Sequence, residues 1–376
     1  MSDPNTIRVL EIDGGGTKGY LSANFLEKFV QLWGIEQNAL AANFDVICGT
    51  SVGGLLAVAF ALGYGAPDIL PFFTVQAPYI FTLGTLTGLP PIPPIPPIPS
   101  IRPSALFKAA LIVAETPFYS SSGYYATTYG SGLLAQTVQN LCGTNTLQNL
   151  QTNIIIPSYQ RDTSSYVLFS NLSFPDFIGQ NALASDVALA TSAAPAYLPS
   201  WKFGGHSYVD GGVYLNNPSE FGLTLGKMIK PNANRYCILS IGTGLGELGF
   251  DSGGVPPPTT FTSFGGDAEK IRRFKLLSEM AKVGGPIDSI LFLWSLGEIG
   301  RTGCQEAFAK NLYLESTYTL DQLYYYRFNP QLDTENYDTE LDSTDPALFA
   351  YYANLATSVF NSDIENIRTF LGHLTA

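Results

Sequence analysis

The stretch Phe44-Asp-Val-Ile-Cys-Gly-Thr-Ser-Val-Gly-Gly-Leu-Leu-Ala-Val-Ala-Phe-Ala-Leu-Gly63 decides the fold of this chain. Residues 44–48 form a short apolar run rich in β-forming residues, which predicts a buried strand. Residues 52–62 are apolar on every side of a helical projection, which predicts a buried helix. Between them Ser51 occupies a sharp turn with a glycine on either side. A serine in a tight strand-to-helix turn is typical of a nucleophile elbow.

The two glycines that flank this serine have a steric reason to be there. A side chain at Gly49 or Gly53 would collide with the tightly turned backbone, and the strained turn lifts the Ser51 hydroxyl above the sheet. The following helix directs its free N–H groups and its positive dipole end toward any anion that forms at that hydroxyl. Because Gly-x-Ser-x-Gly also arises by chance, the rest of the chain has to decide whether this serine is a nucleophile.

Length and composition limit the classes of protein to consider. The 376 residues are enough for one large α/β domain or two smaller ones. Charged residues make up only 13%, so much of the chain must be buried or form uncharged surface. The formal net charge of -12 argues against a nucleic-acid partner and against electrostatic docking on anionic lipid.

Targeting signals and cysteine spacing point to a cytoplasmic protein. The first residues contain neither a basic n-region nor an apolar h-region, so we expect no signal peptide, although export without a cleaved signal stays open. The cysteines lie far apart and lack the spacing of metal ligands, so we expect reduced thiols and no metal site. They are Cys48, Cys142, Cys237 and Cys304.

A second glycine-rich turn, Asp13-Gly14-Gly15-Gly16-Thr17-Lys18-Gly19, lies between a predicted strand at 7–12 and a predicted helix at 20–33. Its backbone N–H groups can surround an anion. A dinucleotide site would need a later strand that ends in an acidic residue, and a P-loop would need a Gly-Lys-Ser/Thr ending; both are missing. Two functions stay open. One is the phosphate loop of an actin-like ATPase or sugar kinase, and the other is an oxyanion hole formed by Gly14, Gly15 and Gly16.

A serine nucleophile needs a base within hydrogen-bonding reach. The chain has only 2 histidines. His373 lies near the chain end, where chains fray, and His206 lies in a predicted hairpin turn, where a histidine is usually solvated. Asp210 is the better candidate, because it ends a predicted strand and precedes Gly211 and Gly212. A carboxylate is a weak base, so Asp210 would need a dry site that raises its pKa.

Strands and helices alternate along the rest of the chain, which predicts a mainly parallel sheet covered on both faces. Further strands are predicted at 153–157, 165–170, 207–209, 236–241 and 324–328, and further helices at 183–191, 219–229, 268–313 and 346–371. The acidic segment 333–345 is expected to be a solvated loop. Residues 46–65 carry no charge, yet their glycines and the elbow argue for a buried strand and helix rather than a membrane span.

A proline-rich segment interrupts this pattern. Residues 69–101 contain no charged side chain, and a Pro-Pro-Ile repeat runs from Pro90 to Pro99. Such a repeat predicts a polyproline II helix with its isoleucines along one edge. It would serve either as a stiff spacer or lid hinge, or as an apolar lip that touches a lipid interface.

Taken in order, the motifs resemble those of the patatin-like phospholipases. They are Asp13–Gly19, Gly49–Gly53, Ala190–Pro195, Asp210–Gly212 with Asn216-Asn217-Pro218, and Ser240–Gly244, with Tyr325-Tyr326-Arg327 further on. The resemblance implies a three-layer α/β/α fold with a mainly parallel central sheet. It also implies that Ser51 is the nucleophile, that Asp210 is the base, that Gly14, Gly15 and Gly16 form the oxyanion hole, and that no metal or cofactor is needed.

The resemblance also sets the expected domain organisation and function. Residues 7–245 would form the catalytic core, 246–376 would complete the same domain with a helical C-terminal part, and 84–103 would be a proline-rich insert. The implied function is a Ca²⁺-independent phospholipase A-type hydrolase that cleaves acyl esters of glycerolipids at a membrane or micelle surface. The alternatives are the actin-like ATPase or sugar kinase and a catalytically silent storage or scaffold protein of this fold.

Lys18 departs from the family pattern, which usually has arginine at this position. Arginine is a planar fork and lysine a point charge, so the bracing that this side chain gives to phosphate or backbone is in question. The backbone N–H groups of the preceding glycines do not depend on it.

Overall fold

The computed structural model describes residues 3–81, 129, 131–163, 165–175, 177–194, 197–213, 215–245 and 322–376. The proline-rich insert predicted at 84–103, the helical region predicted at 268–313 and Cys304 lie outside the described residues.

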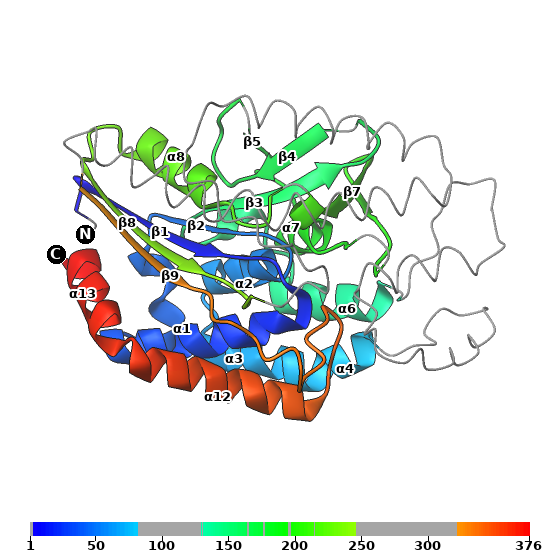
Figure 1. The fold of residues 1–376 in the computed structure, drawn as a ribbon. Coiled ribbons are helices and arrows are strands. Elements are labelled where there is room, and N and C mark those ends of the chain that lie inside the picture. The colour runs from blue at the N-terminus through cyan, green and yellow to red at the C-terminus, as the bar shows by residue number, and fades with distance from the viewer. Residues whose placement is uncertain are drawn as a thin grey trace, which may run out of the picture.

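A mainly parallel sheet forms the middle layer of the molecule (Figure 1). Its strands are β1 (Thr6–Ile12), β2 (Val46–Gly49), β3 (Asn153–Gln160), β4 (Ser165–Phe169), β5 (Phe177–Ile178), β6 (Trp201–Phe203), β7 (His206–Asp210), β8 (Arg235–Ile241) and β9 (Gln322–Phe328). The order is β5-β4-β3-β2-β1-β8-β9, and β7 pairs antiparallel with β3 and β6. Strand β1 is central, because it pairs in parallel with β2 on one side and β8 on the other.

Helices cover both faces of this sheet. They are α1 (Gly19–Trp33), α2 (Val52–Ala61), α3 (Ala66–Pro71), α4 (Ala77–Ile80), α6 (Gly132–Cys142), α7 (Ala184–Thr191), α8 (Ser219–Ile229), α12 (Pro346–Ser362) and α13 (Ile364–Thr375). In Figure 1, α1 and α12 lie below the sheet and α8 lies above it. The expected three-layer α/β/α fold is therefore confirmed.

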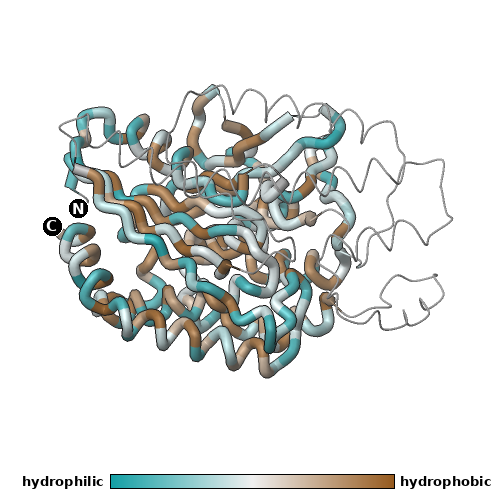
Figure 2. The backbone as a smooth tube through the Cα atoms, in the orientation of Figure 1, coloured by the Kyte–Doolittle hydropathy of each residue, from teal (hydrophilic) through white to brown (hydrophobic). Residues whose placement is uncertain are grey.

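The core divides at the sheet because successive side chains of a strand point to opposite faces. Leu10 and Ile12 of β1 pack with α1, α2 and α12, whereas Ile7 and Val9 pack with α8. All four side chains are fully buried. Figure 2 shows the resulting concentration of hydrophobic residues along the central strands. Burial on both faces explains why these strands are continuous apolar runs instead of alternating ones.

Two stretches differ from the sequence-based expectation. Residues 66–80 had no predicted helix, yet they form α3, a π-helical turn (Phe72–Gln76) and α4. Pro67 and Pro78 fit because they occupy first-turn positions, where no intrahelical N–H bond is lost. The single closing helix predicted at 346–371 is wrong: Asp363 separates α12 from α13.

The uncharged stretch 46–65 forms β2 and the short helix α2, as expected. Among the helices in the described ranges, none combines the length and the hydropathy that a membrane span requires.

Candidate active site

Ser51 occupies the turn between β2 and α2 in a strained backbone conformation. Its φ of 56° is the only positive value for a non-glycine residue in the part of the chain that the structure describes. The Ser51 N–H donates a hydrogen bond to Thr191 Oγ1 at 3.0 Å, and the Thr191 hydroxyl donates to the Pro157 carbonyl at 2.6 Å. Thr50 Oγ1 donates to the Leu215 carbonyl at 2.8 Å. Bonds to two other segments therefore stabilise the turn, and the Pro157 carbonyl holds Thr191 in place.

The flanking glycines are required by close backbone approaches. A Cβ atom at Gly49 would lie 2.3 Å from the Gly53 carbonyl oxygen. A Cβ atom at Gly53 would lie 2.1 Å from the Ile12 carbonyl oxygen, on the neighbouring strand β1. Neither position has room for a side chain, so the turn can pack this tightly only with glycine.

Asp210 ends β7 and lies beside Ser51. The Ser51 hydroxyl donates a hydrogen bond to the Asp210 carboxylate, and the Gly212 N–H donates to Asp210 Oδ1 at 2.7 Å. The carboxylate is buried, with 5% of the residue exposed. Burial raises the pKa of Asp210 to about 7, against the opposing effect of these two hydrogen bonds. The structure thus brings together the hydroxyl and the carboxylate that the sequence singled out.

Strand β3 positions both of these residues. The Pro157 carbonyl on β3 accepts the Thr191 bond that supports the Ser51 turn. The next residue, Ser158, pairs with Asp210 in the antiparallel ladder of β3 and β7. A Cβ atom at Gly211 would lie 2.4 Å from the same Pro157 carbonyl oxygen, so glycine is needed there as well.

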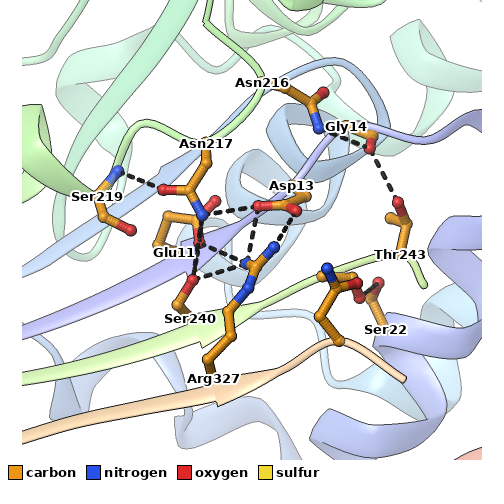
Figure 3. Close-up of polar contacts among 12 residues, drawn as sticks. Glu11, Asp13, Gly14, Ser22, Asn216, Asn217, Ser219, Ser240, Thr243 and Arg327 are labelled. Atoms are coloured by element: carbon orange, nitrogen blue, oxygen red, sulfur yellow. Dashed lines mark hydrogen bonds and ion pairs between the residues drawn. The ribbon is translucent and has the colours of Figure 1, made fainter. Parts of the chain in front are cut away.

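The glycine turn after β1 also lies beside Ser51. A Cβ atom at Gly14 would lie 3.1 Å from Ser51 Cβ. The Gly14 carbonyl accepts hydrogen bonds from Thr243 Oγ1 at 2.9 Å and from Asn216 Nδ2 at 3.3 Å (Figure 3). The Gly14 N–H is directed to the Asn216 carbonyl at 3.4 Å, whereas no described residue accepts a hydrogen bond from the N–H of Gly15 or Gly16. The turn therefore has two backbone donors available to an anion.

A buried polar cluster supports this turn from below (Figure 3). Arg327 on β9 forms a bidentate ion pair with Asp13, with Nη1 to Oδ1 at 2.9 Å. Asn217 Nδ2 donates to Asp13 Oδ1 and to Glu11 Oε2, both at 2.9 Å. Ser240 donates to Glu11 and accepts from Arg327 at 2.8 Å. Because Asp13 is occupied by these partners, the phosphate-loop hypothesis of an actin-like ATPase or sugar kinase has no support here.

Burial sets the charges of this cluster. It raises the pKa of Glu11 well above its usual range, and the neighbouring Asp13 raises it further. Burial lowers the pKa of Arg327, but the adjacent Asp13 carboxylate more than reverses that effect, so the net shift is upward. The Arg327–Asp13 ion pair therefore lies beside a Glu11 carboxyl whose charged form is disfavoured by burial.

The glycine turn is hydrogen-bonded to the acidic segment through Lys18 and Thr17. Lys18 Nζ donates to the Thr339 carbonyl at 3.2 Å, and the Thr17 N–H donates to the Leu341 carbonyl at 2.8 Å. A Cβ atom at Gly16 would lie 2.1 Å from the same Leu341 oxygen. The loop predicted at 333–345 is therefore only half-buried at residues 339–341, where it contacts the glycine turn.

Neither histidine lies near Ser51. His206 begins the five-residue strand that Asp210 ends, so their Cα atoms are about 13 Å apart. Its Nδ1 lies 2.7 Å from Asp162 Oδ2 in an exposed pair. His373 stacks on Tyr324 near the start of β9, with ring centroids 3.7 Å apart, at the opposite end of the sheet. In the described ranges no three His, Cys, Asp or Glu side chains are grouped as metal ligands.

Comparisons with known proteins agree with this architecture. The family profile described as patatin-like phospholipase matches residues 10–221. Patatin-like protein 4 of Arabidopsis thaliana is 28% identical over 269 residues, covering 64% of this chain and 60% of that protein. A cGAMP-activated phospholipase of Vibrio cholerae is 31% identical over 227 residues, covering 58% of this chain and 57% of that protein. The alignments thus span 57% to 60% of these curated relatives.

Among solved structures, VipD from Legionella pneumophila matches 97% of this chain and 67% of its own, with 14% identity and a TM-score of 0.42. That similarity is too weak to support any argument.

Proposed function

This chain belongs to the patatin-like phospholipase family, and we propose on that premise that it is a phospholipase A-type hydrolase of glycerolipid acyl esters. The observation that carries the proposal is the hydrogen bond from the Ser51 hydroxyl to the buried Asp210 carboxylate, at a strained strand-to-helix turn. A nucleophile in direct contact with its base is the arrangement that acyl transfer requires.

The first half of the proposed reaction forms an acyl-enzyme. Asp210 takes the proton of the Ser51 hydroxyl while the Ser51 oxygen attacks the carbonyl carbon of the lipid ester. Negative charge develops on the carbonyl oxygen, and backbone N–H groups among Gly14, Gly15 and Gly16 stabilise it. When the tetrahedral intermediate collapses, the ester C–O bond breaks, and the protonated Asp210 returns its proton to the departing lysolipid oxygen.

The second half releases the fatty acid. Asp210 takes a proton from a water molecule, whose oxygen attacks the acyl carbon of the Ser51 ester. Collapse of the second intermediate restores the Ser51 hydroxyl with the proton that Asp210 held. The pKa of about 7 supports this role, because a general base works best when its pKa lies near the operating pH.

We further propose that the reaction needs no Ca²⁺, because nucleophile, base and oxyanion donors all come from the chain itself. A chelator is then expected to leave the rate unchanged. The setting that we propose is the cytoplasmic surface of a membrane, or a micelle, with peripheral contact. The buried free thiols of Cys48, Cys142 and Cys237 support a reducing compartment.

The test is hydrolysis of phospholipid vesicles, followed by mass spectrometry of the released fatty acids. Ser51→Ala is expected to reduce hydrolysis to background, and Asp210→Asn to lower kcat by about 10²–10⁴-fold. The matched control is His206→Ala, on the same strand as Asp210, which is expected to retain full activity.

Labelling with a fluorophosphonate probe completes the experiment. Wild-type protein is expected to be labelled at Ser51. Activity that survives both Ser51→Ala and Asp210→Asn would end the proposal, and loss of activity in His206→Ala alone would replace Asp210 with histidine as the base. A protein that neither reacts with the probe nor hydrolyses lipid would be the catalytically silent alternative.

A further inference from the structure

We propose that Thr243 is a positioning residue for the oxyanion hole. Its hydroxyl fixes the peptide between Gly14 and Gly15 so that the Gly15 N–H faces the carbonyl that Ser51 attacks. The inference rests on the proposed hydrolase function and adds to it a residue that makes no contact with substrate.

The argument begins with the geometry of one peptide bond. A trans peptide is planar, and its C=O and N–H bonds point in opposite directions. The Gly14 carbonyl and the Gly15 N–H belong to the same peptide. The 2.9 Å hydrogen bond from Thr243 Oγ1 to the Gly14 carbonyl therefore determines the direction of the Gly15 N–H. Asn216 Nδ2 supports the same carbonyl at the longer distance of 3.3 Å.

The topology of the sheet tells where that N–H points. Strand β1 lies between β2 and β8, Ser51 follows β2, and Thr243 follows β8. The ladders continue past the strand ends on both sides: the Asp13 N–H donates to the β8 residue Ile241 at 2.9 Å, and the Ile12 carbonyl accepts from the Thr50 N–H at 3.2 Å. A Gly14 carbonyl directed to the β8 side leaves the Gly15 N–H directed to the side of Ser51.

Contacts around Thr243 show that its side chain is held in place. The residue is buried, with 5% exposed. A Cβ atom at Gly15 would lie 2.2 Å from Thr243 Oγ1, so the threonine packs directly on the Gly15 backbone. On either side of Thr243, the Gly242 N–H donates to the Phe328 carbonyl at 2.6 Å and the Gly244 N–H donates to Asn329 Oδ1 at 2.9 Å. The end of β9 thereby anchors the hydroxyl that orients the peptide.

The test compares threonine variants that keep the shape of the side chain. Thr243→Val fills the same volume without the hydroxyl, and it is expected to lower kcat by about 10- to 100-fold with KM unchanged. Thr243→Ser keeps the hydroxyl and is expected to restore most of kcat. The matched control is Thr17→Val in the same glycine turn, because Thr17 is buried and its hydroxyl has no hydrogen-bond partner among the described residues. That control is expected to retain wild-type kcat.

Binding of a transition-state analogue distinguishes a misoriented Gly15 N–H from a general loss of structure in the variant. A trifluoromethyl ketone of a fatty acyl chain is expected to lose affinity for Thr243→Val by the same factor as kcat/KM. Wild-type kcat and inhibitor affinity in Thr243→Val, with Ser51→Ala inactive, would overturn the inference and leave the hydrolase standing. Equal losses in Thr243→Val and Thr243→Ser, with lowered melting temperatures, would reduce Thr243 to a packing role. If wild-type protein shows no Ser51-dependent hydrolysis, the proposed function fails first and the inference fails with it.

Discussion

At the scale of single residues, the ionisation of Asp210 controls the proposed chemistry. Its carboxylate must be charged to accept the Ser51 proton, and burial raises its pKa to about 7. We therefore expect kcat/KM to rise with pH, to be half-maximal near pH 7 and to level off above it. The measurement is a pH profile on a zwitterionic lipid whose own charge is constant over that range. A profile half-maximal near pH 4 would show that the site does not raise the pKa of the base.

The same carboxylate is expected to make stability depend on pH. The folded-state pKa of about 7 lies above the ordinary value of 3.8, so the folded protein binds the proton more tightly than the unfolded chain. Stability therefore falls as pH rises from about 4 to about 7 and is constant above that range. Relative to wild type, Asp210→Asn is expected to gain up to about 4 kcal/mol of unfolding free energy between pH 4 and pH 8. Urea denaturation at both pH values measures the gain, and a constant difference between variant and wild type would contradict it.

At the scale of elements, replacing glycine with alanine is expected to have opposite effects on stability in two helices. Gly53→Ala in α2 places a methyl group 2.1 Å from the Ile12 carbonyl, whereas a Cβ atom at Gly372 in α13 meets nothing within 4 Å. Gly372→Ala is expected to stabilise the protein by about 0.5–1 kcal/mol, because alanine is the better helix former.

Gly53→Ala is instead expected to destabilise it by more than about 3 kcal/mol, since the backbone of β1 must move. Thermal denaturation of the two variants tests the contrast. A neutral Gly53→Ala variant would show that the Ser51 turn has more room than the distances indicate.

How much of the fold could be predicted from the sequence depended on how local the signals are. Ser51 and its flanking strand and helix could be located because the signals are local: apolar runs of different period joined at Gly49 and Gly53. No helix was predicted at residues 66–80, although Pro67 and Pro78 are accepted there because proline is tolerated in a first helical turn. The break at Asp363 was missed because the apolar pattern continues on both sides of it.

At the scale of the whole molecule, the site depends on contacts between distant segments. The carboxyl ends of β1, β2 and β8 meet at one edge of the sheet, which brings the glycine turn, Ser51 and Thr243 together. The sequence shows each motif, but it does not show which side chains of different motifs form hydrogen bonds with one another. The motif around Arg327 could be noticed, but its pairing with Asp13 could not be read from the chain, because that pairing depends on β9 lying beside β8.

The Arg327–Asp13 pair is expected to couple the last strand to the glycine turn. Asp13 is 2% exposed and the Arg327 side chain 17%, so removing one partner leaves a buried charge uncompensated. Arg327→Met and Asp13→Asn are each expected to lower the unfolding free energy by about 3–5 kcal/mol. The double variant is expected to lose less than the sum, because it leaves neither charge unpaired. Urea denaturation of the four proteins gives the coupling energy. Additive losses would mean that the pair does not join β9 to the site.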